Sequence, residues 1–175
     1  SLALYPDASE LQEALGLALV ASGRGQRALE PLLRASNAQP QDWRLKNALG
    51  VAYEQTGRAQ TARRYFEDAL SLKAGEPAVL SNLALAWVLD GDPARGEQLL
   101  RDAFDEPDAS PQIRQNLALV LALQGRFEEA ESVALIDATP EMAEANMSYV
   151  RAMMSNPRRW ESLADAAGEA GPEGR

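Results

Sequence analysis

The chain has 175 residues, of which 46% are hydrophobic, 17 are basic and 26 are acidic, so its formal net charge is −9 and its pI is near 4.6. It contains no cysteine and no histidine. Thiol catalysis, disulfide bonds, thiolate or imidazole metal sites and histidine-based triads are therefore excluded, because their reactive groups are absent. The acidic balance opposes binding to a phosphate backbone, so we expect no nucleic-acid partner.

The apolar segments are too short to cross a membrane. No run of about eighteen consecutive apolar residues occurs, and residues 1–5 have neither the basic start nor the apolar stretch of a signal peptide. We therefore expect any membrane attachment to depend on a lipid anchor that lay upstream of this chain and was removed.

Glycine recurs at a fixed interval between segments with helical periodicity. Four glycines are each separated by thirty-four residues, namely Gly23, Gly57, Gly91 and Gly125. We expect each of them to adopt a positive φ in a tight turn between two helices. A small residue follows each glycine after five positions, namely Ala28, Ala62, Gly96 and Ala130. This small residue should let the two helices approach closely.

Apolar residues fall on one helical stripe in segment after segment, as in Leu45, Leu49 and Ala52 at i, i+4 and i+7. The pattern predicts an all-α fold. It predicts about ten helices, at residues 9–22, 25–36, 42–55, 59–72, 77–90, 93–104, 111–124, 126–136, 141–155 and 158–167.

The segment from residue 48 to residue 69 has the most specific pattern. Ala48-Leu49-Gly50-Val51-Ala52-Tyr53 is followed by Gly57, Ala62, Phe66 and Ala69. This resembles the tetratricopeptide repeat, a helix-turn-helix unit with the pattern W..LG..Y, then A...F, then P. The resemblance covers nearly the whole chain. It implies a right-handed α-solenoid in which each helix pair buries its apolar faces by stacking on its neighbours.

The repeat frame predicts the domain organisation. Residues 1–8 are interpreted as the tail of a truncated upstream repeat or as a cap, and residues 168–175 as a flexible tail. Between them we expect five repeats, at residues 9–42, 43–76, 77–110, 111–140 and 141–167, the last being a capping pair. Asn146-Met147 follows Asn116-Leu117 after only thirty residues. The second helix of the fourth repeat should therefore be one turn short and end before Thr139-Pro140.

Carboxylates are the remaining catalytic candidates. They form two groups, namely Glu128, Glu129 and Glu131, and Asp102, Asp105, Glu106 and Asp108. Both groups are interpreted as solvated surface. Asp90-Gly91-Asp92 lacks the ligand ladder of a calcium loop and is interpreted as a turn with a helix-capping aspartate. We therefore predict a protein that is not an enzyme and has no cofactor and no metal site.

The resemblance implies a binding groove, because the first helix of each tetratricopeptide unit lines the concave face. The expected lining is Glu10, Glu13, Leu17, Val20, Arg44, Asn47, Val51, Glu54, Ser81, Asn82, Leu85, Val88, Leu89, Gln115, Asn116, Leu119, Ala122 and Leu123. Within it, the expected partner-binding residues are Asn47, Val51, Asn82, Leu85, Val88, Leu89, Asn116, Leu119 and Leu123. The aliphatic side chains would anchor a protein or peptide, and the asparagines would orient its backbone. The alternative is that a tight superhelix or the C-terminal helix covers the strip as ordinary core.

The charge of the expected groove limits its partner. A carboxylate clamp would require lysine and arginine in the first helices, but the corresponding places hold Glu13, Asn47, Ser81 and Gln115. Capture of an acidic C-terminus is therefore disfavoured, and the acidic chain should attract a neutral or basic partner.

The C-terminal half has a narrower resemblance. Residues 79–87, 115–126 and 145–153, with an Asn-x-x-Tyr-x-Arg-x-Met helix followed by Pro157 and Trp160, are similar to the TadD family of tetratricopeptide lipoproteins of tight-adherence (Flp) pilus loci. That resemblance implies a pilotin on the periplasmic side of the bacterial outer membrane, which binds a segment of the pilus secretin and assists its assembly. Two other classes stay open: a self-associating structural scaffold and a regulatory tetratricopeptide domain of a larger protein.

Overall fold

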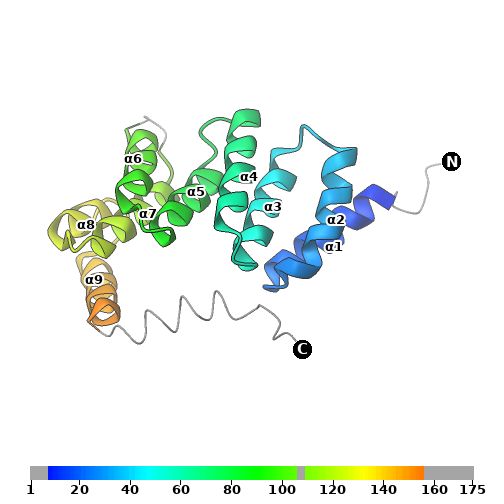
Figure 1. The fold of residues 1–175 in the computed structure, drawn as a ribbon. Helices are drawn as coiled ribbons and strands as arrows, with labels where there is room; N and C mark the ends of the chain where they lie inside the picture. The colour runs from blue at the N-terminus through cyan, green and yellow to red at the C-terminus, as the bar shows by residue number, and fades with distance from the viewer. Residues whose placement is uncertain (1–7, 106–108, 156–175) are drawn as a thin grey trace, which may run out of the picture. The chain divides into compact units, whose positions relative to one another are not determined.

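The computed structural model describes residues 8–105 and 109–155, and within these ranges the regular structure is helical throughout (Figure 1). The helices are α1 (Ala8–Ala21), α2 (Gly25–Ala38), α3 (Trp43–Gln55), α4 (Ala59–Leu72), α5 (Pro77–Leu89), α6 (Pro93–Phe104), α7 (Pro111–Leu123), α8 (Phe127–Ala134) and α9 (Pro140–Met154). The prediction of an all-α fold is confirmed, and the first nine predicted helices lie within two residues of these bounds. The tenth, at 158–167, the tail at 168–175 and residues 1–7 lie outside the described residues.

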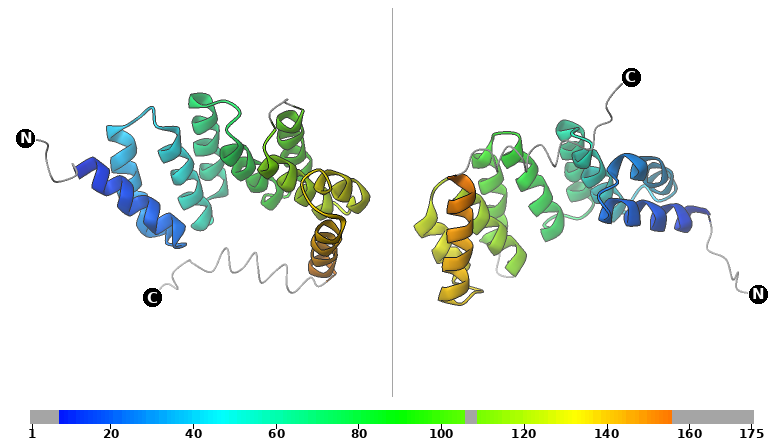
Figure 2. Two further views of the ribbon diagram at one scale, coloured as in Figure 1. Left: turned by 180° about the vertical axis from the view of Figure 1, so that it is seen from behind. Right: turned by 90° about the horizontal axis from the view of Figure 1, so that it is seen from below.

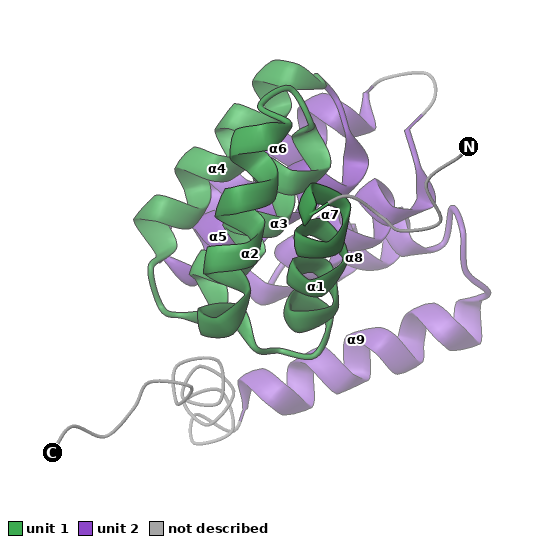
Figure 3. Ribbon diagram, turned by 90° about the vertical axis from the view of Figure 1, so that its right-hand side faces the viewer, with its two compact units in different colours: residues 1–74, 167–175 green, residues 75–166 purple. Residues whose placement is uncertain are grey.

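The chain divides into two compact units at residue 75 (Figure 3). Among the described residues, the first unit holds α1 to α4, and the second holds α5 to α9. In the first unit α1 pairs with α2, α3 pairs with α4, and α3 also packs on α2. In the second unit α5 pairs with α6, α7 pairs with α8, and α9 packs on both α7 and α8. Figure 2 shows α9 next to α8 from two further directions.

The turns inside the hairpins are closed by glycine, as predicted. The four turn glycines have a positive φ, from 72° at Gly23 to 88° at Gly91. In each turn the amide after the glycine donates a hydrogen bond to the carbonyl five residues earlier, for example Arg24 N to Leu19 O at 2.8 Å and Arg126 N to Leu121 O at 3.0 Å. The bond supplies a donor to a carbonyl near the helix end that would otherwise lack a hydrogen-bond partner. Gly75, outside the thirty-four-residue frame, also has a positive φ before α5.

Small residues let the paired helices approach closely. Ala28, Ala62 and Ala130 are completely buried. Gly16 of α1 faces Leu32 of α2, where an added Cβ would lie 2.6 Å from the Leu32 side chain. At the predicted position Gly96 of α6 an added Cβ would lie 2.5 Å from Ala84 O of α5. The predicted close approach within the hairpins is therefore confirmed, and a larger side chain would separate the helices.

The first helices of the repeats begin at residues that the sequence marks as helix starts. Proline occupies the first turn of α5, α7 and α9, where a missing N–H costs little. Asp42, Ser110 and Thr139 accept hydrogen bonds from backbone amides of the helices that follow them. Asp92 does the same for Arg95 N at the start of α6, which confirms its predicted capping role.

The fourth hairpin is shortened as predicted. α8 has 8 residues, whereas α6 has 12 and α4 has 14. It ends at Ala134, and a turn leads to Pro140, where α9 begins.

A buried carboxylate joins the two hairpins of the second unit. Glu97 of α6 has a side chain that is only 12% exposed, and it accepts hydrogen bonds from Arg101 Nε at 2.6 Å, Arg126 Nη1 at 2.6 Å and Gln124 Nε2 at 2.8 Å. Both arginines also bond to Glu129 of α8. Burial opposes ionisation of Glu97, but the hydrogen bonds from Gln124, Arg101 and Arg126 outweigh it and lower its pKa.

Candidate functional site

In the first unit the predicted partner-binding residues lie on α3. Asn47 and Val51 are one turn apart, and both are half-buried. Glu54, one turn further along, is also half-buried, and burial raises the pKa of its carboxyl group. On α1, Glu13 Oε2 accepts a hydrogen bond from Gln39 Nε2 at 3.0 Å, so it is tied to the C-terminal end of α2 in its own hairpin.

In the second unit the predicted aliphatic strip begins on α5 and is only partly covered. Leu85 and Val88 are half-buried, whereas Leu89 is 57% exposed. Val88 is held in place by α6, because a Cβ added at Gly96 would meet both Ala84 O and Val88 Cγ2. Leu89 at the end of α5 is therefore the member of this strip most open to a partner.

The predicted orienting asparagines are half-buried, and one of them makes a hydrogen bond within the protein. Asn116 Nδ2 of α7 donates to Ser81 Oγ of α5 at 2.7 Å, and Ser81 Oγ donates to Pro77 O at 2.7 Å. Asn116 therefore fastens α7 to α5, and Asn82 is half-buried beside this connection. Ser81 is 2% exposed and Ala122 is fully buried, so the expectation that these two line an open groove is wrong. Both positions face the neighbouring helices instead.

A pocket of about 300 Å³ opens between α7, the turn after α8, and α9. We call it the α7–α9 pocket. Its lining is Gln115, Ala118, Leu119, Ala134, Asp137, Ala138, Met142, Asn146, Met147, Tyr149, Val150 and Met153. Gln115 and Leu119 were predicted to face a groove, and Leu119 is half-buried at the pocket wall. Leu123, one turn further, is half-buried outside this lining.

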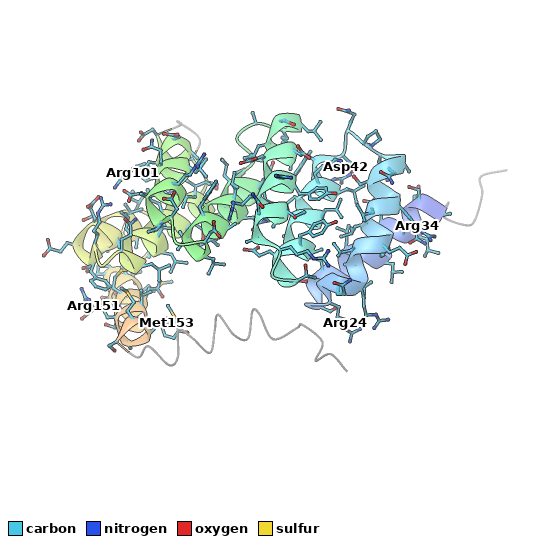
Figure 4. The ribbon with its side chains drawn as sticks, in the orientation of Figure 1. Arg24, Arg34, Asp42, Arg101, Arg151 and Met153 are labelled. Carbon is cyan, nitrogen blue, oxygen red and sulfur yellow. The ribbon has the colours of Figure 1, made fainter. Side chains whose placement is uncertain are left out.

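The wall contributed by α9 was missed as a site by the sequence reasoning. Met142, Asn146, Tyr149 and Met153 are spaced at i, i+4, i+7 and i+11, which places them on one helix face. Met142 and Tyr149 are 58% and 64% exposed. Figure 4 shows the side chains of Arg151 and Met153 projecting from α9. The signal was present, because the chain has four methionines and all of them fall between residues 142 and 154.

The polar wall of the pocket is held by an ion pair. Arg114 of α7 donates to both oxygens of Asp137, from Nε at 2.5 Å and from Nη2 at 2.7 Å, and from Nη1 to Ala109 O at 2.5 Å. The hydrogen bond from Arg114 lowers the pKa of Asp137, so this carboxylate stays ionised. The pair ties the turn before α9 to the start of α7. It therefore holds the turn that leads into α9 against α7.

The acidic groups considered for catalysis occupy surface positions. Glu128 and Glu129 are exposed on α8, and Asp102 accepts a hydrogen bond from Gln98 at 2.6 Å. Glu106 and Asp108 lie outside the described residues. Within residues 8–105 and 109–155, no three acidic side chains come together as a metal site. The same ranges contain no helix with the length and hydropathy to cross a bilayer.

Two sequence-family models match the chain, and both describe the tetratricopeptide repeat. One matches residues 14–78, and the other matches residues 77–102 and 111–135. Together they cover most of the chain, which therefore belongs to the tetratricopeptide repeat family. This family is in general a scaffold for protein–protein interaction. Comparison with the curated proteins finds no match.

Solved structures share the fold at low sequence identity. PilF of Pseudomonas aeruginosa has a TM-score of 0.63 and 19% identity over 95% of this chain and 78% of its own. YrrB, described as a tetratricopeptide protein with an unusual peptide-binding site, has a TM-score of 0.58 and 20% identity over 89% of this chain and 82% of its own. The O-GlcNAc transferase of Thermobaculum terrenum has a TM-score of 0.61 and 19% identity over 78% of this chain. This chain spans only 28% of the transferase, so the likeness does not extend to the whole enzyme.

Proposed function

We propose that this protein is an interaction module whose second unit binds an apolar helix or short peptide in the α7–α9 pocket and beside Leu89 of α5. The observation that carries the proposal is the pocket itself. Its α9 wall presents methionine and tyrosine side chains, of which Met142 and Tyr149 are more than half exposed. Methionine side chains adapt to differently shaped apolar partners, and a tyrosine adds a large contact area with a polar tip.

The size of the site sets the scale of the affinity. Burial of about 300 Å² of apolar ligand surface at about 25 cal/mol per Å² contributes on the order of 7 kcal/mol before the cost of ordering the partner. This corresponds to an affinity in the micromolar range. The net charge of −9 favours a partner that is neutral or basic outside its apolar stripe.

We further propose that the partner is a segment of the secretin of a tight-adherence pilus. In this proposal the protein is a pilotin on the periplasmic side of the outer membrane, attached through a lipid anchor outside this chain. The support is that residues carrying the resemblance to the TadD family also line the α7–α9 pocket. In the helix that carries the resemblance to the TadD family, Asn146, Tyr149 and Met153 line the pocket, and the Arg151 guanidinium lies over the Phe127 ring at 4.5 Å.

Calorimetric titration with synthetic peptides tests the site. Met142→Glu places a charge in the pocket wall and should weaken peptide binding at least tenfold. Met154→Glu is the matched control, because Met154 is 40% exposed on the same helix but does not line the pocket. Leu89→Glu should weaken binding if the peptide extends to α5. Circular dichroism checks that each variant folds, and equal binding by the Met142 and Met154 variants would remove the pocket from consideration.

The identity of the partner is tested separately from the existence of the site. C-terminal peptides of the secretin are compared with a model amphipathic peptide of leucine and lysine. Binding of the secretin peptides with sensitivity to Met142→Glu supports the pilotin role. Binding of the model peptide alone, with the same sensitivity, would retain the interaction module and reject the secretin as its partner.

A further inference from the structure

All of the sulfur in this chain lies in α9. The chain has four methionines and no cysteine, and the methionines are Met142, Met147, Met153 and Met154. A peroxide that reaches the protein therefore finds thioether groups and no thiol. Oxidation of sulfur acts on this one helix and on no other part of the chain.

The four methionines differ in their exposure to solvent. Met142 is 58% exposed and Met154 is 40% exposed, whereas Met153 is half-buried and Met147 is only 4% exposed. The oxidant must touch the sulfur atom, so the rate of oxidation follows exposure. We therefore expect Met142 to react first and Met147 to react last.

The two most exposed methionines differ in their position relative to the α7–α9 pocket. Met142 is part of the pocket lining together with Leu119 of α7, and Met154 lies outside this lining. The first turn of α9 holds the backbone of Met142, because its amide donates to Thr139 Oγ1 at 3.3 Å. A change of polarity at Met142 therefore alters the pocket wall, and the same change at Met154 leaves the lining as it is.

We propose that Met142 is an oxidation site, at which a hydroperoxide converts the thioether to a sulfoxide and thereby releases an apolar partner from the α7–α9 pocket. This role of Met142 rests on the proposed function of the pocket. A sulfur lone pair attacks the terminal oxygen of the hydroperoxide, the S–O bond forms and the O–O bond breaks. The sulfur is oxidised by two electrons. The leaving oxygen is reduced, takes up the proton of the transferred oxygen and departs as water or an alcohol.

A sulfoxide at Met142 opposes burial beneath an apolar partner. Its oxygen is polar and accepts hydrogen bonds from water, and a partner that covers it removes that water without replacing it. The thioether has no such group to desolvate, and its flexible stem adapts to apolar partners of different shape. The sulfoxide should therefore weaken binding about tenfold or more. The change is reversible, because sulfoxide reductases restore the thioether.

Mass spectrometry of the full chain during treatment with dilute hydrogen peroxide tests the site of oxidation. The sulfoxide should appear at Met142 before Met154, and at Met147 last. Circular dichroism before and after treatment checks that the helices remain. Oxidation of Met142 no faster than that of the buried Met147 would overturn the proposal.

Calorimetric titration with the amphipathic peptide of leucine and lysine described above tests the consequence for binding. After a peroxide dose that adds about one oxygen atom per chain, the peptide should bind about tenfold more weakly, and reductases for both sulfoxide epimers should restore its affinity. Equal binding before and after oxidation would overturn the role of Met142 and leave the function of the pocket intact. No binding by the untreated chain would overturn both.

Two leucine variants identify the sulfur that is responsible. Leucine keeps the helix surface apolar and contains no sulfur to oxidise. Met142→Leu should have the same dissociation constant before and after peroxide treatment, whatever its starting value. Met154→Leu is the matched control, and on treatment it should lose affinity as the unaltered chain does. Loss of affinity by the treated Met142 variant would overturn the proposal, because another group would then be responsible.

A protection measurement keeps the test decisive if Met142→Leu binds the peptide too weakly to titrate. A saturating concentration of the peptide should slow the oxidation of Met142 in the unaltered chain, because the bound peptide covers its sulfur. The oxidation of Met154 should continue at its former rate. Equal rates of Met142 oxidation with and without the peptide would overturn the proposal.

Discussion

Gly50 of α3 lies directly against the ring of Phe66 of α4, so that a Cβ added at Gly50 would overlap the Cε1 and Cδ1 atoms of that ring. The same relationship holds between Gly16 and Leu32 in the preceding hairpin. Phe66 and Leu32 are both completely buried. Glycine inside a helix is normally unfavourable, and here it is the condition that lets a large side chain occupy the centre of the hairpin.

Gly50→Ala should destabilise the first unit by about 1–3 kcal/mol through overpacking. Helix propensity alone predicts the opposite sign, a gain of about 1 kcal/mol. Urea unfolding followed by circular dichroism measures the difference. In a Phe66→Leu background the cost of Gly50→Ala should shrink, because the ring that causes the overlap is gone. An unchanged cost in that background would show that the ring is not the cause.

The buried carboxylate of Glu97 should contribute much more than an exposed one. Glu97→Gln removes the buried one of the two carboxylates that Arg101 and Arg126 share, so that only Glu129 remains to both, and it should cost about 1–3 kcal/mol of unfolding free energy. The control is Glu30→Gln, which breaks the exposed pair with Arg34 at 2.6 Å and should cost less than about 0.5 kcal/mol. Chemical unfolding of both variants at neutral pH measures the two losses of unfolding free energy. Equal losses would contradict the role assigned to Glu97.

Glu54 should weaken the first unit at neutral pH. Burial raises its pKa above the ordinary value of 4.5, so the folded state binds a proton more tightly than the unfolded state. Stability from this group is therefore present below its ordinary pKa and is lost as pH rises through the folded value. Glu54→Gln should be more stable than the unaltered chain at pH 7, and the difference should vanish towards pH 4. Thermal unfolding across this range measures it, and a constant difference would contradict the assignment.

The ion pair of Arg114 and Asp137 should hold α9 in place. Asp137→Asn replaces a carboxylate that accepts two hydrogen bonds from Arg114 with a neutral amide, so α9 should open more often. Hydrogen exchange should become faster in α9 and remain unchanged in α1 to α4. Asp102→Asn is the control, because Asp102 is exposed on α6 and accepts a hydrogen bond from Gln98 of the same helix, far from the Arg114–Asp137 pair in the sequence. Equal exchange in α9 for both variants would rule out this role of the pair.

Local features of the fold could be read from the sequence because they depend on neighbouring residues only. The turn at Gly23 needs a residue that tolerates a positive φ, and the start of α6 needs a side chain such as Asp92 that accepts from a free backbone amide. The deletion of one turn in α8 was also visible, because it shifts Asn146 against the repeat.

The candidate site could be predicted only in part. Leu89 and Leu119 were placed on the correct helices, but their role as partner-binding residues stays a prediction. Asn116 was expected to orient a ligand; the structure shows that its amide nitrogen donates to Ser81, and its role toward a ligand stays a prediction. A helical pattern shows which side a residue occupies and not which polar atom lies opposite it.

Taken alone, the amino-acid sequence determined the class of fold, the helix pairs and their turns, since backbone preference and apolar periodicity act over a few residues. The packing of the helices in three dimensions was needed to show that Met142 and Tyr149 border a pocket and that Ser81 is buried and bonded to Asn116. It was also needed to show that Leu11 is exposed to solvent whereas Leu45 is buried. The physical reason is that exposure depends on whether a neighbouring helix packs on a residue. Leu11 and Leu45 hold the same place in the repeat, and the helix packed beside each makes the difference.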